Sequence, residues 1–561
     1  MADDTPEHIV ESTDVVVIGF GAAGVSAAIT AREQGVQVVA LDRANGGGAT
    51  AISGGIIYAG GGTAVQQQAG VRDSFEQMLT YLRLEVADAV SESTLESFVR
   101  GSPEMIDWLS NYGVPFDSTV CPYKTSFPNN HYYLYHSGSE NSGAFRSHTP
   151  PVQRGHRVKG KGTSGKQLYA PLAKAALSLG VQFYPHTKVT KLLQDSTGRV
   201  TGVEAMTMHD APPRIRRTYA ALAAVSTKPG IYYPPLRNLM ERRLRALERR
   251  YARAVQIRAR RGVIVCAGGF IANSEWIKRY APRYVTGLQL GTSGDDGSGI
   301  ALAQSVGAVT ERMDNVSAWR FITPPSAFIS TVMVDQQGQR VIDESRYGAA
   351  VGKALVQDHN ARAWLVADAD LMNEARRQML KQPLWFQRAQ AAALMVADSV
   401  RAETLADVAR KAGVDPDGLQ ATVDAPEPCS THPVRRFPVC SVRVARQPAS
   451  APTPMSAGCP SQIACFPGVA PAPTPPAPRS NRPSAAQRGS RLGQVRIRKR
   501  SSRRGVGQVM HDHRPQPSDE FLVVHVQQRR EADYVAGRRH TDHLRCHQRG
   551  AFGPPVRHDR R

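Results

Sequence analysis

The sequence predicts an α/β protein built on a parallel or mixed sheet. Residues 14–18 form a β-branched apolar run, and Gly19-Phe-Gly21-Ala-Ala-Gly24 follows at once. A helical pattern then leads to a second apolar strand at 36–41, which ends before Asp42. A strand, a glycine turn, a helix and a strand in this order are typical of a βαβ unit of about 30 residues.

Helices and strands continue to alternate after this unit, as expected for an α/β sheet. The patterns predict a helix near 166–179, a strand at 181–184, a hairpin-like pair at 189–194 and 199–206, and a strand at Val263–Val265. Residues 305–420 indicate mixed strands and helices, with a helical stretch rich in Ala and Arg from about 371 to 411.

The segment 210–261 has a different composition and is expected to be an insertion. Its apolar residues are spaced by four, four, three and four positions, which places them on one face of a helix, with Arg and Glu filling the other face. These apolar residues are Leu236, Met240, Leu244, Leu247 and Tyr251. We expect a packed or interface helix, and adsorption to a membrane surface is the alternative.

The positive charge of the chain is concentrated at its C-terminal end. The 561 residues carry a net charge of +22, and residues 425–561 hold 24 Lys and Arg against 8 Asp and Glu, with 19 of the 38 prolines. Periodicity also disappears there, so the sequence predicts a disordered Arg/Pro-rich tail. Without aromatic residues interleaved among the arginines, we expect no specific nucleic-acid partner.

The remaining composition favours a cytoplasmic protein. No stretch approaches the roughly 20 apolar residues of a membrane span, and the N-terminus is acidic where a secretory signal is basic. Outside the tail the only cysteines are Cys121 and Cys266, too few for a disulfide framework or a thiolate metal site.

The glycine motif predicts a dinucleotide site, and the residues after it favour a flavin. Gly19, Gly21 and Gly24 permit a tight turn, approach of a pyrophosphate and close helix packing, while Asp42 can accept ribose hydroxyls. A second loop rich in glycine and hydroxyl groups, 46–55, comes directly after Asp42. Paired glycines follow the strand at Val265, and another glycine-rich turn spans 294–299.

With four further motifs, this set resembles the flavoprotein family of fumarate reductases and 3-ketosteroid dehydrogenases. The motifs Ser137-Gly-Ser-Glu140, Gly160-Lys-Gly-Thr-Ser-Gly-Lys166, Trp319-Arg-Phe-Ile-Thr-Pro-Pro325 and Asp343-Glu-Ser-Arg-Tyr-Gly348 are most similar to the branch that desaturates the C4–C5 bond of 5α-3-ketosteroids. The resemblance covers about residues 12–424.

The resemblance implies a Rossmann-like FAD-binding domain at 12–304, containing the 210–261 insertion, and an α+β substrate or cap domain at 305–424. It implies that the cap covers the flavin ring and that no metal is required. The FAD contacts carried over are Gly19, Gly21, Ala22, Ala23, Gly24, Asp42, Arg43, Gly48, Ala49, Thr50, Ser53, Gly54, Gly55, Val189, Ala267, Gly268, Gly269 and Asp296.

Desaturation next to a ketone requires a polarised carbonyl, a base, a hydride acceptor and an apolar slot. The flavin accepts the hydride and passes electrons to an external acceptor. Trp319, Phe321 and Phe328 are expected to line a slot for a hydrophobic, steroid-like substrate, and Tyr347 beside Arg346 is the expected catalytic side chain. Arg320 and Arg346 leave open a fumarate- or urocanate-type reductase.

Residues 425–561 lack the terminal segment of this family, and we expect them to be out of frame. Codons chosen for Val444 to Ala470 (VARQPASAPTPMSAGCPSQIACFPGVA) and read one base earlier permit GRAPAGICSNPYVSGLSLADCVFSGRR, which resembles the missing segment. In the family that segment carries a Tyr and a Ser that act on the substrate. The chain is therefore expected to be impaired, or to be a catalytically dead remnant.

Overall fold

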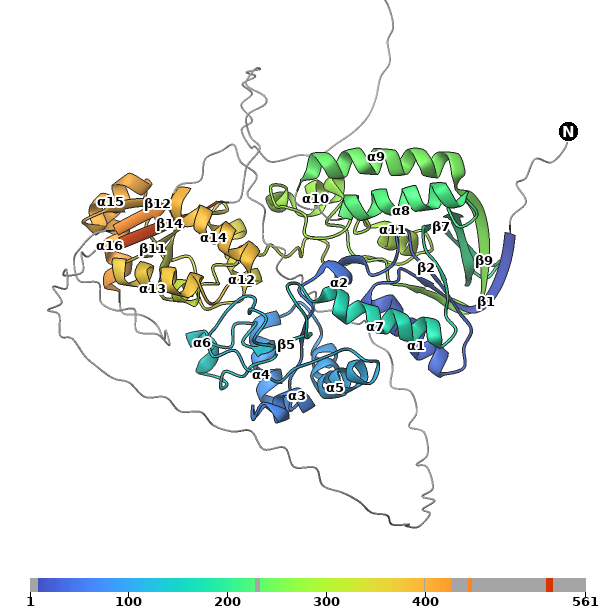
Figure 1. The fold of residues 1–561 in the computed structure, drawn as a ribbon, viewed down its shortest axis with the longest axis horizontal. Helices are drawn as coiled ribbons and strands as arrows, with labels where there is room; N and C mark the ends of the chain where they lie inside the picture. Colours follow the sequence, from blue (N-terminus) through green and yellow to red (C-terminus); the bar gives the residue numbers. More distant parts are fainter. Residues whose placement is uncertain (1–8, 228–232, 398, 426–441, 446–520, 528–561) are drawn as a thin grey trace, which may run out of the picture.

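A computed structural model describes residues 9–227, 233–397, 399–425, 442–445 and 521–527, which are arranged around three sheets (Figure 1). The largest has six strands in the order β6-β2-β1-β9-β8-β7. Four of them are parallel and the β7–β8 hairpin is antiparallel, which confirms the α/β prediction. Its strands are β1 (Ile9–Ile18), β2 (Val38–Leu41), β6 (Gln182–Tyr184), β7 (Thr187–Gln194), β8 (Val200–Thr207) and β9 (Arg253–Val265).

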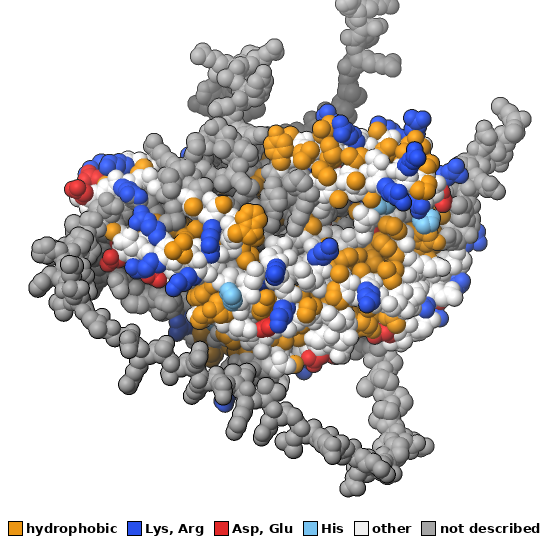
Figure 2. All heavy atoms as spheres, in the orientation of Figure 1, with side chains coloured by type: hydrophobic (Ala, Val, Ile, Leu, Met, Phe, Trp, Pro, Cys, Tyr) orange, Lys and Arg blue, Asp and Glu red, His pale blue; other side chains and the backbone are white. Residues whose placement is uncertain are grey.

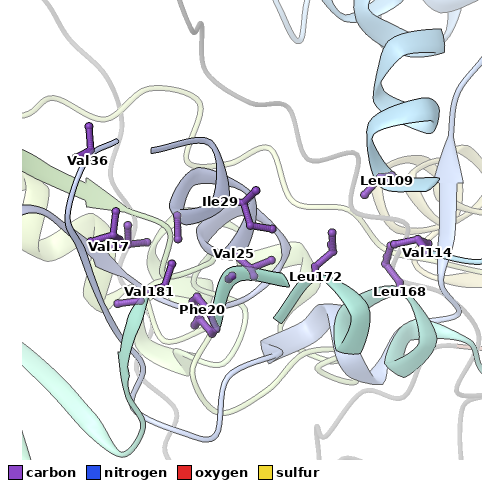
Figure 3. Close-up of a cluster of buried hydrophobic side chains, with 14 of the residues drawn as sticks. Val17, Phe20, Val25, Ile29, Val36, Leu109, Val114, Leu168, Leu172 and Val181 are labelled. Carbon is purple, nitrogen blue, oxygen red and sulfur yellow. The ribbon is translucent and has the colours of Figure 1, made fainter. Parts of the chain in front are cut away.

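The helices α1 (Ala22–Glu33) and α7 (Gly165–Ser178) pack together against this sheet. Val17 of β1, Val25 and Ile29 of α1, and Leu168 and Leu172 of α7 meet in one buried cluster (Figure 3). Side chains three and four residues apart share a helix face, so one face of α1 is buried against β1 and α7. This packing holds the N-terminus of α1 next to the carboxyl end of β1. The helix expected at 166–179 is thereby confirmed.

A helical hairpin lies between β8 and β9. Its helices α8 (Pro213–Thr227) and α9 (Pro234–Tyr251) run side by side (Figure 1), and Met240 and Leu244 are buried as the apolar spacing predicts. The strand β9 begins at Arg253, so the last residues of the expected 210–261 insertion belong to the sheet. They alternate between the buried Val255, Ile257 and Ala259 and partly or fully exposed neighbours, which is the period of a strand.

The smallest of the three sheets has three strands in the order β3-β5-β4. It is covered by short and long helices that build their own buried cluster around Met78 and Leu82. The elements of this part are α2 (Gly48–Ile52), β3 (Ile56–Tyr58), α3 (Ala64–Gln68), α4 (Phe75–Val86), α5 (Glu92–Asn111), β4 (Leu134–Tyr135), α6 (Gly143–Arg146) and β5 (Gly155–Arg157).

The third sheet has the order β10-β11-β14-β12-β13 and, with the helices around it, forms a separate α/β part that we name the cap (Figure 1). Its strands are β10 (Val332–Val334), β11 (Arg362–Ala367), β12 (Ser399–Ala402), β13 (Val442–Ala445) and β14 (Phe521–Gln527). The helices there are α12 (Gly348–Asp358), α13 (Ala369–Met379), α14 (Trp385–Ala397), α15 (Leu405–Ala412) and α16 (Pro416–Asp424). In the sequence, α10 (Ser274–Tyr280), α11 (Ser298–Gln304) and two 3₁₀ turns, Pro282–Tyr284 and Ser326–Ser330, come between β9 and β10.

The helical stretch expected from 371 to 411 is wrong in its middle, where β12 pairs antiparallel with β13 and β14. A strand of four residues is too short to show a strand period in the sequence. It forms here because it pairs with partners that are distant in the chain. Apart from the strands β13 and β14, the expected disordered tail at 425–561 lies almost wholly outside the described residues.

Candidate active site

The glycine motif forms the turn between β1 and α1. Gly19 has φ +92°, and a Cβ added there would lie 2.4 Å from the carbonyl oxygen of Cys266. A Cβ on Gly24 would lie 1.8 Å from the carbonyl oxygen of Gly19, so only glycine permits this packing. A Cβ on Gly21 would meet no atom closer than 3.8 Å, so its backbone is open. The tight turn at Gly19 and the close packing at Gly24 are as the motif predicts, and the open backbone at Gly21 leaves room for a ligand.

Asp42 ties the end of β2 to this turn. Its Oδ2 accepts a hydrogen bond from the Phe20 backbone N–H at 2.8 Å, and its Oδ1 accepts one from Ala44 at 2.7 Å. The second loop closes over the same place, because Thr50 Oγ1 accepts from the Ala22 N–H at 3.2 Å. Ser53 serves the loop itself, since its hydroxyl donates to the Thr50 carbonyl and accepts from the Gly55 N–H.

These segments border a cavity of about 710 Å³. Most of the expected cofactor residues line it, namely Gly19, Gly21, Ala22, Ala23, Asp42, Arg43, Gly48, Ala49, Thr50, Ser53, Val189, Ala267 and Gly268. Gly24, Gly54, Gly55, Gly269 and Asp296 do not. Gly24 and Gly55 instead allow backbone segments to approach closely. Asp296 forms a 2.6 Å ion pair with Arg43, which does line the cavity.

Other residues that the sequence motifs do not predict also line this cavity. Cys266 and Thr292 line it from the loops beyond β9, and Tyr219, Glu241 and Glu248 line it from the α8–α9 hairpin. The sequence analysis placed both glutamates with the arginines on the outer face of α9. In the sequence, the only sign that the two glutamates belong together is that they are seven residues apart, which places them on one side of the helix.

Ionisable groups gather at the Asp42 end of the cavity. Burial disfavours the charged form of Arg43, but Asp296, Glu241 and Glu248 raise its pKa above the usual value. Burial raises the pKa of Asp295 and lowers the pKa of Arg237. This end therefore carries more carboxylates than cations.

A second, smaller cavity lies where the cap meets the 124–137 segment. Its volume is about 10 Å³, which is the size of one water. Lys124, Phe321, Arg346 and Tyr347 are among its lining residues. The Tyr347 ring packs edge-on against Trp319 with centroids 4.7 Å apart, and Trp319 packs on Phe321 at 5.5 Å. The expected catalytic pair and two of the three expected substrate residues are thus brought together.

Phe328 does not join them. It is 7% exposed and packs in the cap core with Met333, Val351 and Leu365. The sequence analysis expected it beside the substrate because it follows the aromatic loop. The 3₁₀ turn at Ser326–Ser330 turns this ring into the core instead.

Ser139 links the pocket to the FAD-domain side, since its Oγ accepts from the Tyr347 N–H at 2.9 Å and from Arg346 Nε at 3.2 Å. Nearby, Lys124 lies 3.7 Å from Glu140, both buried. Burial lowers the pKa of Lys124, and Glu140 partly offsets this. The Ser137–Glu140 motif was the sequence signal for this contact, although Lys124 itself was missed.

The large cavity fits an extended dinucleotide. Gly21 begins α1 without a side-chain cap of its own. The Ala22 N–H already donates to Thr50, so the next N–H groups of the first turn are the ones available to a pyrophosphate. The open backbone at Gly21 and the acid at the end of β2 complete the set that such a cofactor needs. Within the described residues no cluster of His, Cys, Asp and Glu could hold a metal ion, and no helix is long and apolar enough to cross a membrane.

Comparison with known proteins agrees with this site. The FAD binding domain family matches residues 14–457. A 3-oxo-5-alpha-steroid 4-dehydrogenase from Comamonas testosteroni is 38% identical over 424 residues, covering 74% of this chain and 78% of the relative. A 3-oxosteroid 1-dehydrogenase from Mycobacterium tuberculosis is 27% identical over 455 residues, covering 74% of this chain and 78% of the relative.

A solved structure is also similar. The 3-ketosteroid-Δ4-(5α)-dehydrogenase from Rhodococcus jostii RHA1, in complex with 4-androstene-3,17-dione, superimposes with a TM-score of 0.60 at 30% identity. The match covers 75% of this chain and 77% of that one. The chain therefore belongs to the FAD-binding flavoprotein family that includes the 3-ketosteroid dehydrogenases, and it is an FAD-dependent oxidoreductase by that membership.

Proposed function

We propose that this protein desaturates a 3-ketosteroid, at the 4,5 or the 1,2 bond, with FAD as the hydride acceptor. The observation that carries the proposal is the aromatic wall of Trp319, Phe321 and Tyr347, which an apolar ring system can pack against. The similarity to steroid dehydrogenases supports the same substrate class.

In this proposal the residues of the large cavity hold the FAD. The N-terminus of α1 would hold the pyrophosphate, Asp42 would accept ribose hydroxyls, and Thr50 would offer its hydroxyl to the cofactor. When bound, the flavin supplies the hydride acceptor of the reaction. An external acceptor then takes up the electrons.

Tyr347 and Arg346 are the proposed catalytic pair. Arg346 precedes Tyr347 in the chain, and its guanidinium lies over the Phe145 ring. A cation close to a phenol favours the phenolate, so Tyr347 can hold or release a proton at its Oη, or donate a hydrogen bond to the ketone. Ser139 keeps both in place through the hydrogen bonds to the Tyr347 N–H and Arg346 Nε. Because the cavity beside them has room for about one water, the cap must shift for a steroid to enter.

We further propose that activity in this chain is impaired by its out-of-frame C-terminal end. The segment missing from the family pattern carries side chains that act on the substrate, and nothing within 425–561 replaces them. Sequencing the gene across codons 420–471 tests this directly. An unbroken frame in independent isolates would contradict a sequencing error.

The functional test is anaerobic mixing of the FAD-loaded protein with a 5α-3-ketosteroid while the flavin absorbance is followed. A dehydrogenase bleaches its flavin, and Tyr347→Phe should slow the bleaching at least 100-fold. A fumarate-type reductase, which the cations Lys124, Arg320 and Arg346 would suit, instead reoxidises a reduced flavin when an unsaturated acid is added. The assay is run on this chain and on a frame-corrected one, and no bleaching in either would overturn the steroid proposal.

A further inference from the structure

The α8–α9 hairpin covers the end of the cofactor cavity that contains Asp42. Tyr219 of α8 and Glu241, Leu244 and Glu248 of α9 line the same cavity as Asp42. The Tyr219 ring packs edge-on against His186 with centroids 4.9 Å apart, and the His186 backbone N–H donates to the Ala44 carbonyl. The hairpin is therefore joined to the loop just after Asp42.

Most charges of α9 are sorted between its two sides; the exception is the half-buried Arg237, which lies near Glu241 and Asp295. Glu241 and Glu248 are half-buried towards the cavity, where Ser226 Oγ donates to Glu241 at 2.6 Å and Tyr219 donates to Glu248. The exposed arginines of this helix are Arg242, Arg243, Arg245, Arg249 and Arg250, and Figure 2 shows Lys and Arg along this edge. Each carboxylate can accept more hydrogen bonds than the one from its protein donor, so the two groups at the cavity suit a bound partner that donates hydrogen bonds.

Electrostatics decides which part of a dinucleotide can lie there. Four carboxylates line the cavity here, those of Glu241, Glu248, Asp42 and Asp295. The cations in the lining are Lys188 and Arg43, and Arg43 is already paired with Asp296. Such carboxylates repel a phosphate, whereas the N-terminus of α1 attracts one. The pyrophosphate therefore belongs at α1. The hairpin end suits the hydroxyl and amino donors of a nucleoside.

We propose that the α8–α9 hairpin is a lid that holds the adenosine half of FAD, with the carboxylates of Glu241 and Glu248 accepting hydrogen bonds from the ribose or the adenine amino group. The inference rests on the assignment of the large cavity to FAD. It adds a determinant outside the glycine motif, contributed by a segment that the motif does not predict.

ADP is the probe, because it contains the adenosine and pyrophosphate groups but needs neither the flavin nor the steroid chemistry. Binding of ADP to the full-length, FAD-free protein is measured by calorimetry for the native chain, for E241Q/E248Q and for R245Q. The double variant should bind ADP at least about tenfold more weakly, because two charge-assisted acceptors become neutral ones. R245Q changes an exposed residue of the same helix and should bind like the native chain.

Net charge makes the result easy to interpret. Removing two negative charges would by itself strengthen attraction of an anion, so weaker binding cannot come from long-range charge. The proposal would be contradicted if E241Q/E248Q bound ADP as tightly as the native chain or more tightly, or if the native chain bound no ADP. The thermal midpoint without ligand reports folding. If it falls in the double variant, the single variant E241Q is compared instead. A failure of steroid oxidation leaves this measurement unaffected.

Discussion

At Gly24 one added methyl group would lie 1.8 Å from the Gly19 carbonyl oxygen, and both positions belong to rigid backbone. The Gly19 carbonyl could make room for this methyl group only if α1 separated from β1. At the exposed Gly101 in α5, by contrast, an added Cβ meets no atom within 4 Å. A Gly→Ala substitution at each position therefore distinguishes a steric requirement for glycine from the general effect of glycine on helix propensity.

Gly24→Ala should lose FAD binding by at least 100-fold and destabilise the fold by more than about 4 kcal/mol, because the α1 turn has to open. Gly101→Ala should stabilise the fold by about 0.5–1 kcal/mol and leave FAD binding unchanged. Flavin retention after desalting and urea unfolding measure both. Normal FAD binding in Gly24→Ala would contradict the packing argument.

Glu344 gives a pH dependence with a definite sign. It is 3% exposed, and burial raises its pKa to about 7, although Arg340 at 2.6 Å and the Met333 N–H pull the pKa down. The folded protein thus keeps a proton that the unfolded chain releases near its ordinary pKa. Stability from this group is full below about pH 4.5 and is lost as the pH rises towards 7.

Glu344→Gln should therefore flatten the stability profile between pH 5 and 7.5, whatever its effect on the absolute level. Urea unfolding of the native chain and of Glu344→Gln across this range is the measurement. Glu374→Gln is the control, because Glu374 is exposed and its pKa is lowered by Arg377. A native slope retained in Glu344→Gln would assign the pH dependence to other groups.

At the scale of elements, the α8–α9 hairpin is held by its own small core. Leu244 is 6% exposed and packs with Met208 and Tyr219, whereas Leu239 on the same helix is 46% exposed. The spacing of apolar residues predicts this helix correctly. It does not reveal that the opposite side divides again into an acidic strip at the cavity and an arginine strip outside.

Leu244→Ala should destabilise the hairpin by about 2–4 kcal/mol, as expected for a large-to-small change in a packed core. Leu239→Ala should change stability by less than about 0.5 kcal/mol. Hydrogen exchange of the α8 and α9 amides reports the local effect. Equal protection in the two variants would mean that the hairpin is stabilised elsewhere.

At the scale of the whole molecule, the two cavities depend on different parts of the chain. The large cavity is built from the large sheet and the hairpin, while the Tyr347 pocket needs the cap to dock on the 124–143 segment. Ser126 binds Thr323, and Ser142 binds Asp343, across this junction. Cofactor binding and substrate chemistry can therefore fail separately.

If the C-terminal end is out of frame, this chain should retain FAD weakly and a frame-corrected chain should retain it fully. The flavin absorption of both proteins, measured after FAD is added and the sample desalted, checks this. Equal retention would show that the described residues complete the flavin site by themselves. A colourless native chain beside a yellow corrected one would locate the defect in the tail.

The sequence by itself determined the glycine turn and the acid at the end of β2 that border the large cavity, because their geometry is local. Gly19, Gly21, Gly24 and Asp42 fall within one βαβ unit, and adjacent chain segments fix their geometry. The same local character explains why the helices at 166–179 and 236–251 were predictable from their apolar periods.

Only the tertiary structure decided which distant residues meet these. The inward turn of Glu241 and Glu248, the burial of Phe328 in the cap core and the contact of Ser139 with Tyr347 join segments up to some 200 residues apart. The short strand β12 likewise exists through its partners β13 and β14. Such contacts depend on packing and pairing between separate elements, for which a local pattern carries no signal.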